Sequence, residues 1–429
     1  MIFNKIKGLH IDGKKSLVNE KEILSFLEPK HIYIPLKTNV IYEPQVNVGD
    51  YVLKGDVVAK RLGKFGHNVH SSVSGKVISI KKIWHPSGKM VETLEIENDF
   101  QEKINNDKKI NFELSKESII DIMQNIGLVG LGGAGFPTFA KYKDQNAKIL
   151  IINCVECEPY LNTDYSIIIN ECEMLLNGIK YLQIASGATR VVIAIKKNKK
   201  NAITILNNLI EAYDGFELLL LKDVYPAGYE KYIVQKVIKK DYNGLPISEG
   251  VIVNNAQTAY ALARSIKEGL PLIEKYITVS GEGVNNPSVI RVKIGCLLSE
   301  VIEYLNGYKD EPSGSYLILG GPMTGNSVAC DDVVITAEAS GACIIKKSTI
   351  KYSLECMGCG KCSTHCPVKL TPTEIKHAFI SNDLELLKEL NATKCIQCGL
   401  CSYVCPSRIE ISDYVNKARN YVYKNESHK

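Results

Sequence analysis

Hydrophobic residues recur along the chain in short runs, and two of these runs predict a regular element. In residues 115–128, Ile119, Ile122 and Ile126 follow the three- and four-residue spacing of one helix face, which predicts a helix. Residues 148–153, KILIIN, form a continuous apolar and β-branched run, which predicts a short buried strand. No run approaches the roughly 18–20 apolar residues needed to cross a bilayer. We therefore expect packed domains without a membrane span.

Length and composition indicate a multidomain globular protein. A chain of 429 residues predicts roughly two to four domains. The apolar content of 45% and charged content of 23% are typical of soluble proteins, and a net charge of +5 is too small to indicate nucleic-acid binding. Residues 1–15 lack the apolar stretch of a secretory signal, so we expect a cytosolic protein.

Cysteines provide the clearest chemical signal. Thiols stay reduced in the cytosol, so clustered cysteines there predict metal or redox sites. Of fourteen cysteines, eight lie in two copies of C-x2-C-x2-C-x3-C-P, at 356–367 and 395–406. The other six are scattered: Cys154, Cys157, Cys172, Cys296, Cys330 and Cys343.

The cysteine spacing is typical of two 4Fe–4S clusters. Three closely spaced thiolates cap one cluster, and in two-cluster ferredoxins the fourth cysteine ligates the other cluster. This predicts crossed ligation, with one cluster held by Cys356, Cys359, Cys362 and Cys405. The second cluster would be held by Cys395, Cys398, Cys401 and Cys366. The alternative is a pair of zinc sites, which usually place two CxxC pairs across a longer loop.

Two helix starts are predicted between the cysteine motifs. Thr371, followed by Pro372 and Glu374, is typical of a capped first turn. Asn382, with Glu385 three residues later, predicts a second capped helix. The motifs therefore belong to a helical ferredoxin-type domain.

A glycine loop, GLVGLGGAGFPTFAK at 127–141, suits an anionic ligand. Gly130, Gly132 and Gly135 satisfy G-x-G-x-x-G, but the segment before the loop is predicted to be a helix, so the usual dinucleotide-binding context of a preceding strand is missing. Bare backbone N–H groups can still form an anion-binding nest, with Lys141 nearby. A tight structural turn is the alternative.

Polar residues follow the predicted strand at 148–153. Ligands of open α/β sheets bind beyond the carboxyl ends of strands, and Asn153, Glu156 and Glu158 stand there. These groups could hydrogen-bond a ribose, a ribityl chain or a flavin edge, or they could be solvated loop charges. Cys154 and Cys157 form a CxxC pair, so a redox dithiol is a further alternative.

These segments, VGLGGAGFPTFAK and LIINCVECEPY, resemble the flavin-binding region shared by the NADH-oxidising subunit of complex I and the C subunit of Rnf complexes, the RnfC family. The resemblance implies an FMN phosphate contacted by Gly130, Gly132, Gly133, Gly135 and Lys141. It also implies flavin contacts from Asn153 and Glu156, a nicotinamide nucleotide facing Glu158, and Phe136 near the stacked rings. YPAGYEKY at 225–232 resembles the family's second nucleotide loop, which implies Gly228 and Glu230. GVIVNNAQT at 250–258 resembles the loop over FMN, which implies Asn254, Asn255 and Thr258.

The segment at 32–81 has the V-G-D-x-V-x-x-G and S-G-x-V pattern of a barrel-sandwich domain, as in biotinyl and lipoyl carriers. Lys60 and Lys64 lack the neighbours of a modified carrier lysine, so a structural role is expected. His67 and His70 could bind a metal, or they could be ordinary polar residues at a strand edge.

The order of domains strengthens the resemblance to the RnfC family. We expect a multidomain α/β and α+β protein: an N-terminal segment and barrel-sandwich hybrid at 1–100, a Rossmann-like FMN/NADH domain at 110–270, a β-grasp (SLBB) domain at 275–345 and a two-cluster ferredoxin domain at 350–420. No residues of the β-grasp domain converge like a site, so we expect it to be a spacer.

The family implies a function in electron transfer. Electrons would pass from NAD(H) to FMN, then singly to two 4Fe–4S clusters and on to a partner, within a membrane-bound ferredoxin:NAD oxidoreductase of the translocase class (EC 7) coupled to Na+ or H+. The implied partners are integral-membrane and ferredoxin-like Rnf subunits, with this chain peripheral on the cytoplasmic face. GLHIDGKK and NVIYEPQV stand where the family usually has G-G-x-H-P-P and G-A-P. Two alternatives therefore stay open: an Rnf-like paralogue serving a soluble reductase such as proline reductase, and a cluster-only adaptor.

Overall fold

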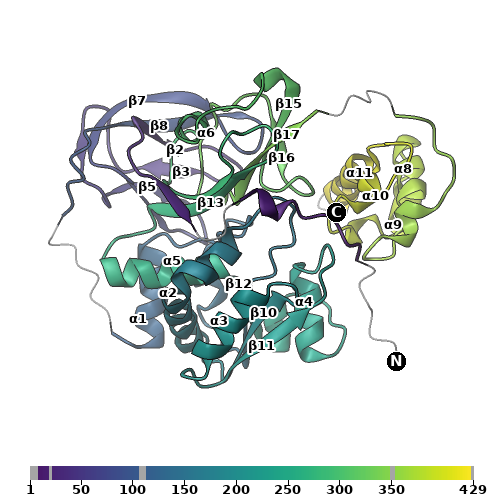
Figure 1. Cartoon of the computed structure of the whole chain (residues 1–429), viewed down its shortest axis with the longest axis horizontal. Coiled ribbons are helices and arrows are strands. Elements are labelled where there is room, and N and C mark those ends of the chain that lie inside the picture. The colour runs from purple at the N-terminus through teal and green to yellow at the C-terminus, as the bar shows by residue number, and fades with distance from the viewer. Residues whose placement is uncertain (1–7, 19–21, 106–112, 348–352, 427–429) are drawn as a thin grey trace.

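Figure 1 shows the computed structural model of the chain, which describes residues 8–18, 22–105, 113–347 and 353–426. A barrel-sandwich, an α/β domain and a β-grasp domain pack together, and a small helical domain lies to one side (Figure 1). This architecture agrees with the predicted multidomain α/β and α+β fold class.

The barrel-sandwich consists of two sheets, ordered β2-β8-β7-β4 and β3-β5-β6. The strands are β2 (His31–Pro35), β3 (Tyr42–Pro44), β4 (Tyr51–Val52), β5 (Val57–Arg61), β6 (Asn68–His70), β7 (Gly75–Trp84) and β8 (Met90–Asn98). Its core is aliphatic and includes the fully buried Ile32, Val58 and Leu94.

The two histidines considered as metal ligands, His67 and His70, hydrogen-bond to backbone carbonyls. His70 places Nδ1 3.0 Å from the carbonyl of Gly55 and Nε2 2.8 Å from that of Asn125, at the end of the first helix of the α/β domain. His67 places Nδ1 3.2 Å from the carbonyl of Phe65. These contacts fit the polar interpretation, and His70 helps to fasten the barrel to the α/β domain.

The α/β domain has a parallel sheet in the order β11-β10-β9-β12. Its strands are β9 (Ile149–Asn153), β10 (Arg190–Lys196), β11 (Phe216–Leu221) and β12 (Val251–Asn255). Its helices are α1 (Lys116–Asn125), α2 (Thr163–Ser186), α3 (Lys200–Ile210), α4 (Glu230–Ile238) and α5 (Ala256–Glu268). The predicted strand and the predicted first helix are both confirmed. Ser115 caps α1 by accepting from the N–H of Ser118, and Ile119 and Ile122 are buried.

The β-grasp domain has a six-stranded sheet in the order β1-β14-β13-β17-β15-β16. Its elements are β1 (Ile23–Phe26), β13 (Glu274–Ser280), β14 (Ser288–Lys293), β15 (Ser315–Leu319), β16 (Asn326–Val328), β17 (Gly341–Lys346) and α6 (Leu298–Tyr304). Strand β1 pairs in parallel with β14, so part of the N-terminal segment that precedes the barrel completes this sheet. Pairing between segments so far apart leaves no local pattern in the sequence.

The helical domain contains α7 (Lys361–Thr364), α8 (Pro372–Ile380), α9 (Leu384–Glu389), α10 (Leu400–Tyr403) and α11 (Ile411–Glu426). Helix α8 begins at Pro372 as predicted, but the predicted cap is wrong, because the Thr371 side chain makes no capping hydrogen bond. The predicted cap at Asn382 is wrong by one residue, because the Asp383 carboxylate accepts from the N–H of Leu386 at 3.0 Å. Asn382 instead occupies the left-handed turn before it, with φ of 54°.

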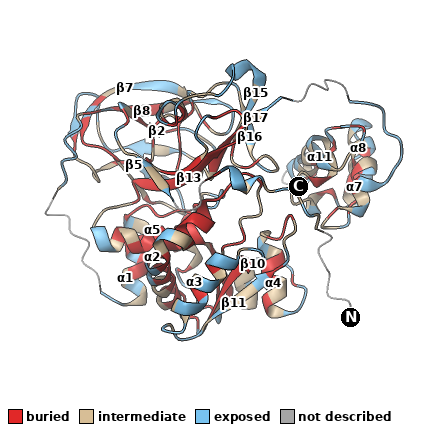
Figure 2. Ribbon diagram, in the orientation of Figure 1, coloured by how far each residue is buried: buried red, intermediate tan, exposed pale blue. Residues whose placement is uncertain are grey.

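Buried residues gather along β13 and around α2, where the β-grasp sheet lies over the α/β domain (Figure 2). Helix α2 crosses α5 closely, since a Cβ added to Gly178 would lie 1.8 Å from the carbonyl oxygen of Ala259. The position therefore requires glycine.

We expect Gly178→Ala to lower the free energy of unfolding by about 3 kcal/mol, because two helix backbones must move apart. Gly314→Ala is the matched control, since a Cβ there meets no atom within 4 Å. Calorimetric unfolding of both variants checks the prediction, and equal transition temperatures would contradict it.

Candidate functional site

The carboxyl ends of β9 and β12 form one edge of the sheet. The strands are parallel neighbours, and Asn153 is the register partner of Asn255. Asn153 donates from Nδ2 to the carbonyl of Gly228 at 2.9 Å, and Asn255 donates from Nδ2 to Oδ2 of Asp164 at 2.8 Å. Asn254 donates to the Tyr142 hydroxyl. The predicted residues from three separate segments therefore meet at the edge where sheets of this kind bind ligands.

The glycine loop lies against the end of β12. The N–H of Leu131 donates to the Thr258 hydroxyl at 3.0 Å, and a Cβ on Gly132 would lie 3.1 Å from the Cβ of Asn255. Gly133 and Gly135 have φ of 109° and 58°, which favour glycine. The loop follows a helix, as predicted, and it presents an exposed backbone at Gly132 and Gly133. This geometry suits a phosphate nest.

Lys141 approaches the same edge from the end of the loop. It is the last residue of η2 (Thr138–Lys141), and its Nζ donates to the carbonyl of Val253 at 2.8 Å. Burial lowers the pKa of Lys141, while the charge of Glu230 opposes that shift. Glu230 is the first residue of α4, and a Cβ on the nearby Gly228 would lie 3.0 Å from Sγ of Cys157. The second nucleotide loop, at 225–232, thus borders the edge that the glycine loop and Lys141 approach.

Glu156 has an unused acceptor in this site. Its Oε1 accepts from the N–H of Asp164 at 2.9 Å. Its Oε2 is buried, lies 3.6 Å from Nζ of Lys15, and has no hydrogen-bond partner among the described residues. A buried acceptor without a donor is unfavourable, so this oxygen fits a ligand N–H or hydroxyl group. Asp164 and Lys15 were not predicted from the sequence.

The carboxylate of Glu158 points to the β-grasp domain. It accepts from the N–H of Met323 at 3.1 Å and from the Thr324 hydroxyl at 2.6 Å. Burial raises the pKa of Glu158, and these two hydrogen bonds oppose the rise. A Cβ on Gly321 would lie 2.1 Å from Oε2 of Glu158, so only glycine fits there. This contact was not predicted from the sequence, and the nucleotide-facing role of Glu158 stays a prediction.

Phe136 lies beside the barrel. It is 37% exposed, and its ring stands edge-to-face with that of Phe65, at 5.2 Å between centroids. Phe65 comes from the tip between β5 and β6, where carriers place their modified lysine. The barrel tip therefore borders the glycine loop.

The CxxC pair after β9, Cys154 and Cys157, carries free thiols. Burial raises the pKa of both, which disfavours the reactive thiolate. A redox dithiol receives no support from this environment.

The second predicted cluster set is brought together in the helical domain. Burial raises the pKa of Cys395, and it raises those of Cys398 and Cys401 to about 12. The charge of Cys366 adds to the rise at all three, so this cysteine from the first motif lies beside the second motif. That is the arrangement which crossed ligation requires.

Two of the cysteines predicted to hold the first cluster are more exposed to solvent than any of those predicted to hold the second. Cys356 and Cys359 are exposed, whereas Cys362 and Cys405 line the core of the helical domain. Among residues 8–18, 22–105, 113–347 and 353–426, no group of three or more His, Cys, Asp and Glu side chains is placed to hold one metal ion.

The second cysteine loop touches both neighbouring domains. The Tyr225 hydroxyl donates to the carbonyl of Cys398 at 2.8 Å. A Cβ on Gly399 would lie 2.7 Å from the carbonyl oxygen of Met323, whose N–H binds Glu158. We call the groups at the carboxyl ends of β9 and β12 the strand-end site. Met323 thus lies between the second cysteine loop and Glu158 of this site.

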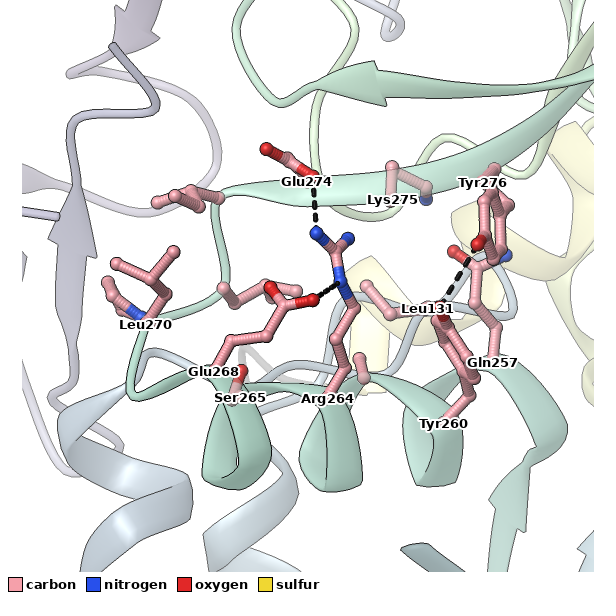
Figure 3. A pocket seen from close by; sticks show the side chains of 14 residues that line it. Leu131, Gln257, Tyr260, Arg264, Ser265, Glu268, Leu270, Glu274, Lys275 and Tyr276 are labelled. Carbon is pink, nitrogen blue, oxygen red and sulfur yellow. Dashed lines mark hydrogen bonds and ion pairs between the residues drawn. The ribbon is translucent and has the colours of Figure 1, made fainter. Parts of the chain in front are cut away.

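A pocket between α5 and β13 is filled by its own side chains (Figure 3). Arg264 binds Glu274 at 2.6 Å and Glu268 at 2.9 Å, and the hydroxyls of Tyr260 and Tyr276 lie 3.0 Å apart. The remaining cavity is about 20 Å³, which suits water and not a nucleotide.

Four segments match known families. Residues 3–101 match the RnfC barrel sandwich hybrid domain, and residues 123–264 match the Nuo51 FMN-binding domain. Residues 276–327 match the SLBB domain, and residues 355–410 match the 4Fe-4S dicluster domain.

Curated relatives are similar over most of their length. The C subunit of the ion-translocating oxidoreductase complex of Rhodobacter capsulatus is 33% identical over 392 residues, which cover 88% of this chain and 75% of that protein. The C subunit of the Na(+)-translocating ferredoxin:NAD(+) oxidoreductase complex of Acetobacterium woodii is 32% identical over 380 residues, which cover 86% of this chain and 85% of that protein. The C subunit of the proton-translocating ferredoxin:NAD(+) oxidoreductase complex of Clostridium ljungdahlii is 30% identical over 381 residues, which cover 85% of this chain and 82% of that protein.

A solved structure supports the fold alone. The NAD+-reducing NiFe-hydrogenase in its air-oxidised state aligns with a TM-score of 0.52 at 16% identity, covering 72% of this chain and 66% of that one. Within the described residues, no helix is both long and apolar enough to span a membrane.

Asp164 gives the site a pH-dependent stability. Burial raises its pKa from 3.8 to about 8, the charge of Glu156 adds to the rise, and Lys15 and Lys275 oppose it. Because the folded chain holds this proton more tightly than the unfolded chain, stability is lost as pH rises through that interval. We expect Asp164→Asn to lose less stability than the parent between these pH values, with the exposed Asp121→Asn as control. Calorimetry across the interval tests this, and parallel curves would contradict it.

Proposed function

This chain belongs to the RnfC family, the C subunits of Rnf-type, ion-translocating oxidoreductase complexes, and we propose that it exchanges electrons between NAD(H) and the other subunits. It carries a domain of the FMN-binding type and one of the 4Fe-4S dicluster type. The proposed route runs from NAD(H) through FMN and two 4Fe–4S clusters to a partner. The chain would form the oxidoreductase part of a translocase.

The observation that carries the proposal is the junction between the two sites. Tyr225 stands at the strand-end edge and donates to the backbone of Cys398 in the second cysteine loop. Met323 contacts that loop at Gly399 and binds Glu158 beside the first site. Electron transfer between a flavin and a cluster requires that they be close, and these contacts support such an arrangement.

The strand-end residues fit FMN. The exposed glycine backbone at Gly132 and Gly133 and the ammonium of Lys141 would hold its phosphate. The free Oε2 of Glu156 and the amide of Asn153 would meet the flavin. When bound, FMN supplies the conversion between electron pairs from nicotinamide and single electrons for iron–sulfur clusters. The chain itself needs only to bind, align and exclude water, with no acid–base catalyst.

Backbone donors would tune the second cluster. The N–H of Gln397 donates to Sγ of Cys395 at 3.4 Å, and the N–H of Leu370 donates to Sγ of Cys366 at 3.2 Å. Hydrogen bonds to cluster sulfurs stabilise the more negative, reduced state. These donors would make the second cluster easier to reduce.

The proposed partners are integral-membrane and ferredoxin-like subunits that couple electron flow to Na+ or H+ movement, with this chain peripheral on the cytoplasmic face. The sequence departures near the N-terminus favour testing an Rnf-like paralogue as the second candidate. Co-purification of the native protein from membranes separates the two, because membrane subunits accompany only the first, whereas a soluble reductase accompanies the second.

We expect Lys141→Ala to lose the yellow flavin absorption, because the variant lacks the ammonium proposed to hold the FMN phosphate. The rate of NADH-dependent dye reduction should fall by about tenfold or more. Its iron content should stay unchanged, as in the exposed neighbour control Lys143→Ala. Retained flavin in Lys141→Ala would contradict the phosphate assignment.

Crossed ligation predicts which variants behave alike. Cys366→Ala and Cys398→Ala should each disrupt the second cluster, lowering iron from about eight to about four per chain and leaving the same surviving cluster signal by electron paramagnetic resonance. Cys359→Ala should disrupt the first cluster and leave the signal of the second. If Cys366→Ala matched Cys359→Ala instead, ligation would be uncrossed.

A further inference from the structure

Residues 8–18, the N-terminal strap, lie across the α/β domain although they are outside its matched segment 123–264. The strap pairs with the second nucleotide loop: Leu9 and Tyr225 exchange backbone hydrogen bonds of 3.0 and 2.8 Å. Farther along, the N–H of Tyr160 donates to the carbonyl of Gly13 at 2.7 Å. These contacts hold the strap at both ends of the strand-end site.

Lys15 reaches from the strap into that site. Its ammonium donates to the carbonyl of Leu161 and lies 3.6 Å from Oε2 of Glu156. Both side chains are shielded from water, at 14% and 10% exposure. The contact therefore lies beneath the surface, where charge interactions are screened less than between exposed groups.

Lys15 lies against a cluster of carboxyl groups. Glu156, Glu158 and Asp164 gather at the end of β9, and the charge of Lys15 lowers the pKa of both Glu158 and Asp164 against the effect of burial. Its neighbour Lys14 points elsewhere, since its ammonium lies 3.2 Å from Asp12 and its side chain is 48% exposed.

Other cations near the site are engaged differently. Lys275 approaches Asp164 from β13, where its Nζ donates to the carbonyl of Ala337. Lys196 forms an ion pair with Asp223 at 2.9 Å. Lys15 is thus the cation placed against the Glu156 carboxylate in the described structure.

We propose that Lys15 is a positioning residue of the flavin site: it orients Glu156 so that Oε2 meets the ligand, and it offsets the carboxylate charge around it. The inference rests on the proposed FMN site. A cation here also favours the more negative, reduced form of a bound flavin. Because the strap also pairs with Tyr225, which contacts Cys398, the same segment borders both the proposed flavin site and the second cysteine loop.

The test compares Lys15→Met, Lys15→Arg and the matched control Lys14→Met in the full chain with its clusters in place. We expect Lys15→Met to bind FMN about tenfold more weakly, by fluorescence titration, and to lower the midpoint potential of the bound flavin. Lys15→Arg should restore most of both properties, because it keeps the charge. Lys14→Met should behave as the parent.

Two results would overturn the inference. One is an unchanged affinity and potential in Lys15→Met. The other is a fall of about tenfold in the FMN affinity of Lys15→Arg relative to the parent. Because this variant keeps the charge, that fall would assign the effect to shape and not to charge, and it can be measured even if Lys15→Met folds poorly. If the parent chain itself takes up no FMN while holding its iron, the proposed function fails.

Discussion

A partly buried carboxylate holds the α/β, β-grasp and helical domains of this protein in register. Glu158 stands at the end of the flavin-type sheet, yet its oxygens are bound by Met323 and Thr324 of the β-grasp domain. A carboxylate withdrawn from water needs such donors, and losing them would leave a costly unpaired charge. Since the cysteine loop packs on Met323 at Gly399, the distance between the two proposed redox sites depends on this contact being satisfied. The β-grasp domain therefore contacts both the strand end at Glu158 and the second cysteine loop at Gly399.

The strand-end site is organised by polar contacts of the same kind. Asn153 and Asn255 bind Gly228 and Asp164, so the amides are held in place before any ligand arrives. Beside them, Oε2 of Glu156 has no hydrogen-bond partner among the described residues. A site built this way loses little order on binding, which favours affinity and alignment. Alignment is what hydride transfer to a flavin requires, whereas proton transfer by a side chain is not needed.

The sequence predicts features that depend on local pattern. The spacing of Ile119 and Ile122 and the run at 148–153 predict an observed helix and strand, because burial of one face or of a whole strand leaves a short-range signature. Helix caps are harder to place, since Asn382 and Asp383 are chemically similar neighbours and only backbone geometry selects Asp383. The contacts of strand β1, Phe65 and Lys15 could not be predicted in this way, because their partners lie far away in the chain and no periodicity records such contacts.

The strap explains how the unusual N-terminal sequence is compatible with the family's architecture. The contacts at Leu9 and Gly13 use backbone groups, which any residue except proline can supply at a donor position. Lys15 adds a side chain that reaches the flavin-type site. Residues between these points can vary without moving the strap, so the departure of GLHIDGKK from the usual motif need not alter the site. The strap therefore constrains the sequence at one cation, at two backbone positions and at Gly8, where a Cβ would lie 2.7 Å from Cγ2 of Val224, and not at every residue of the family motif.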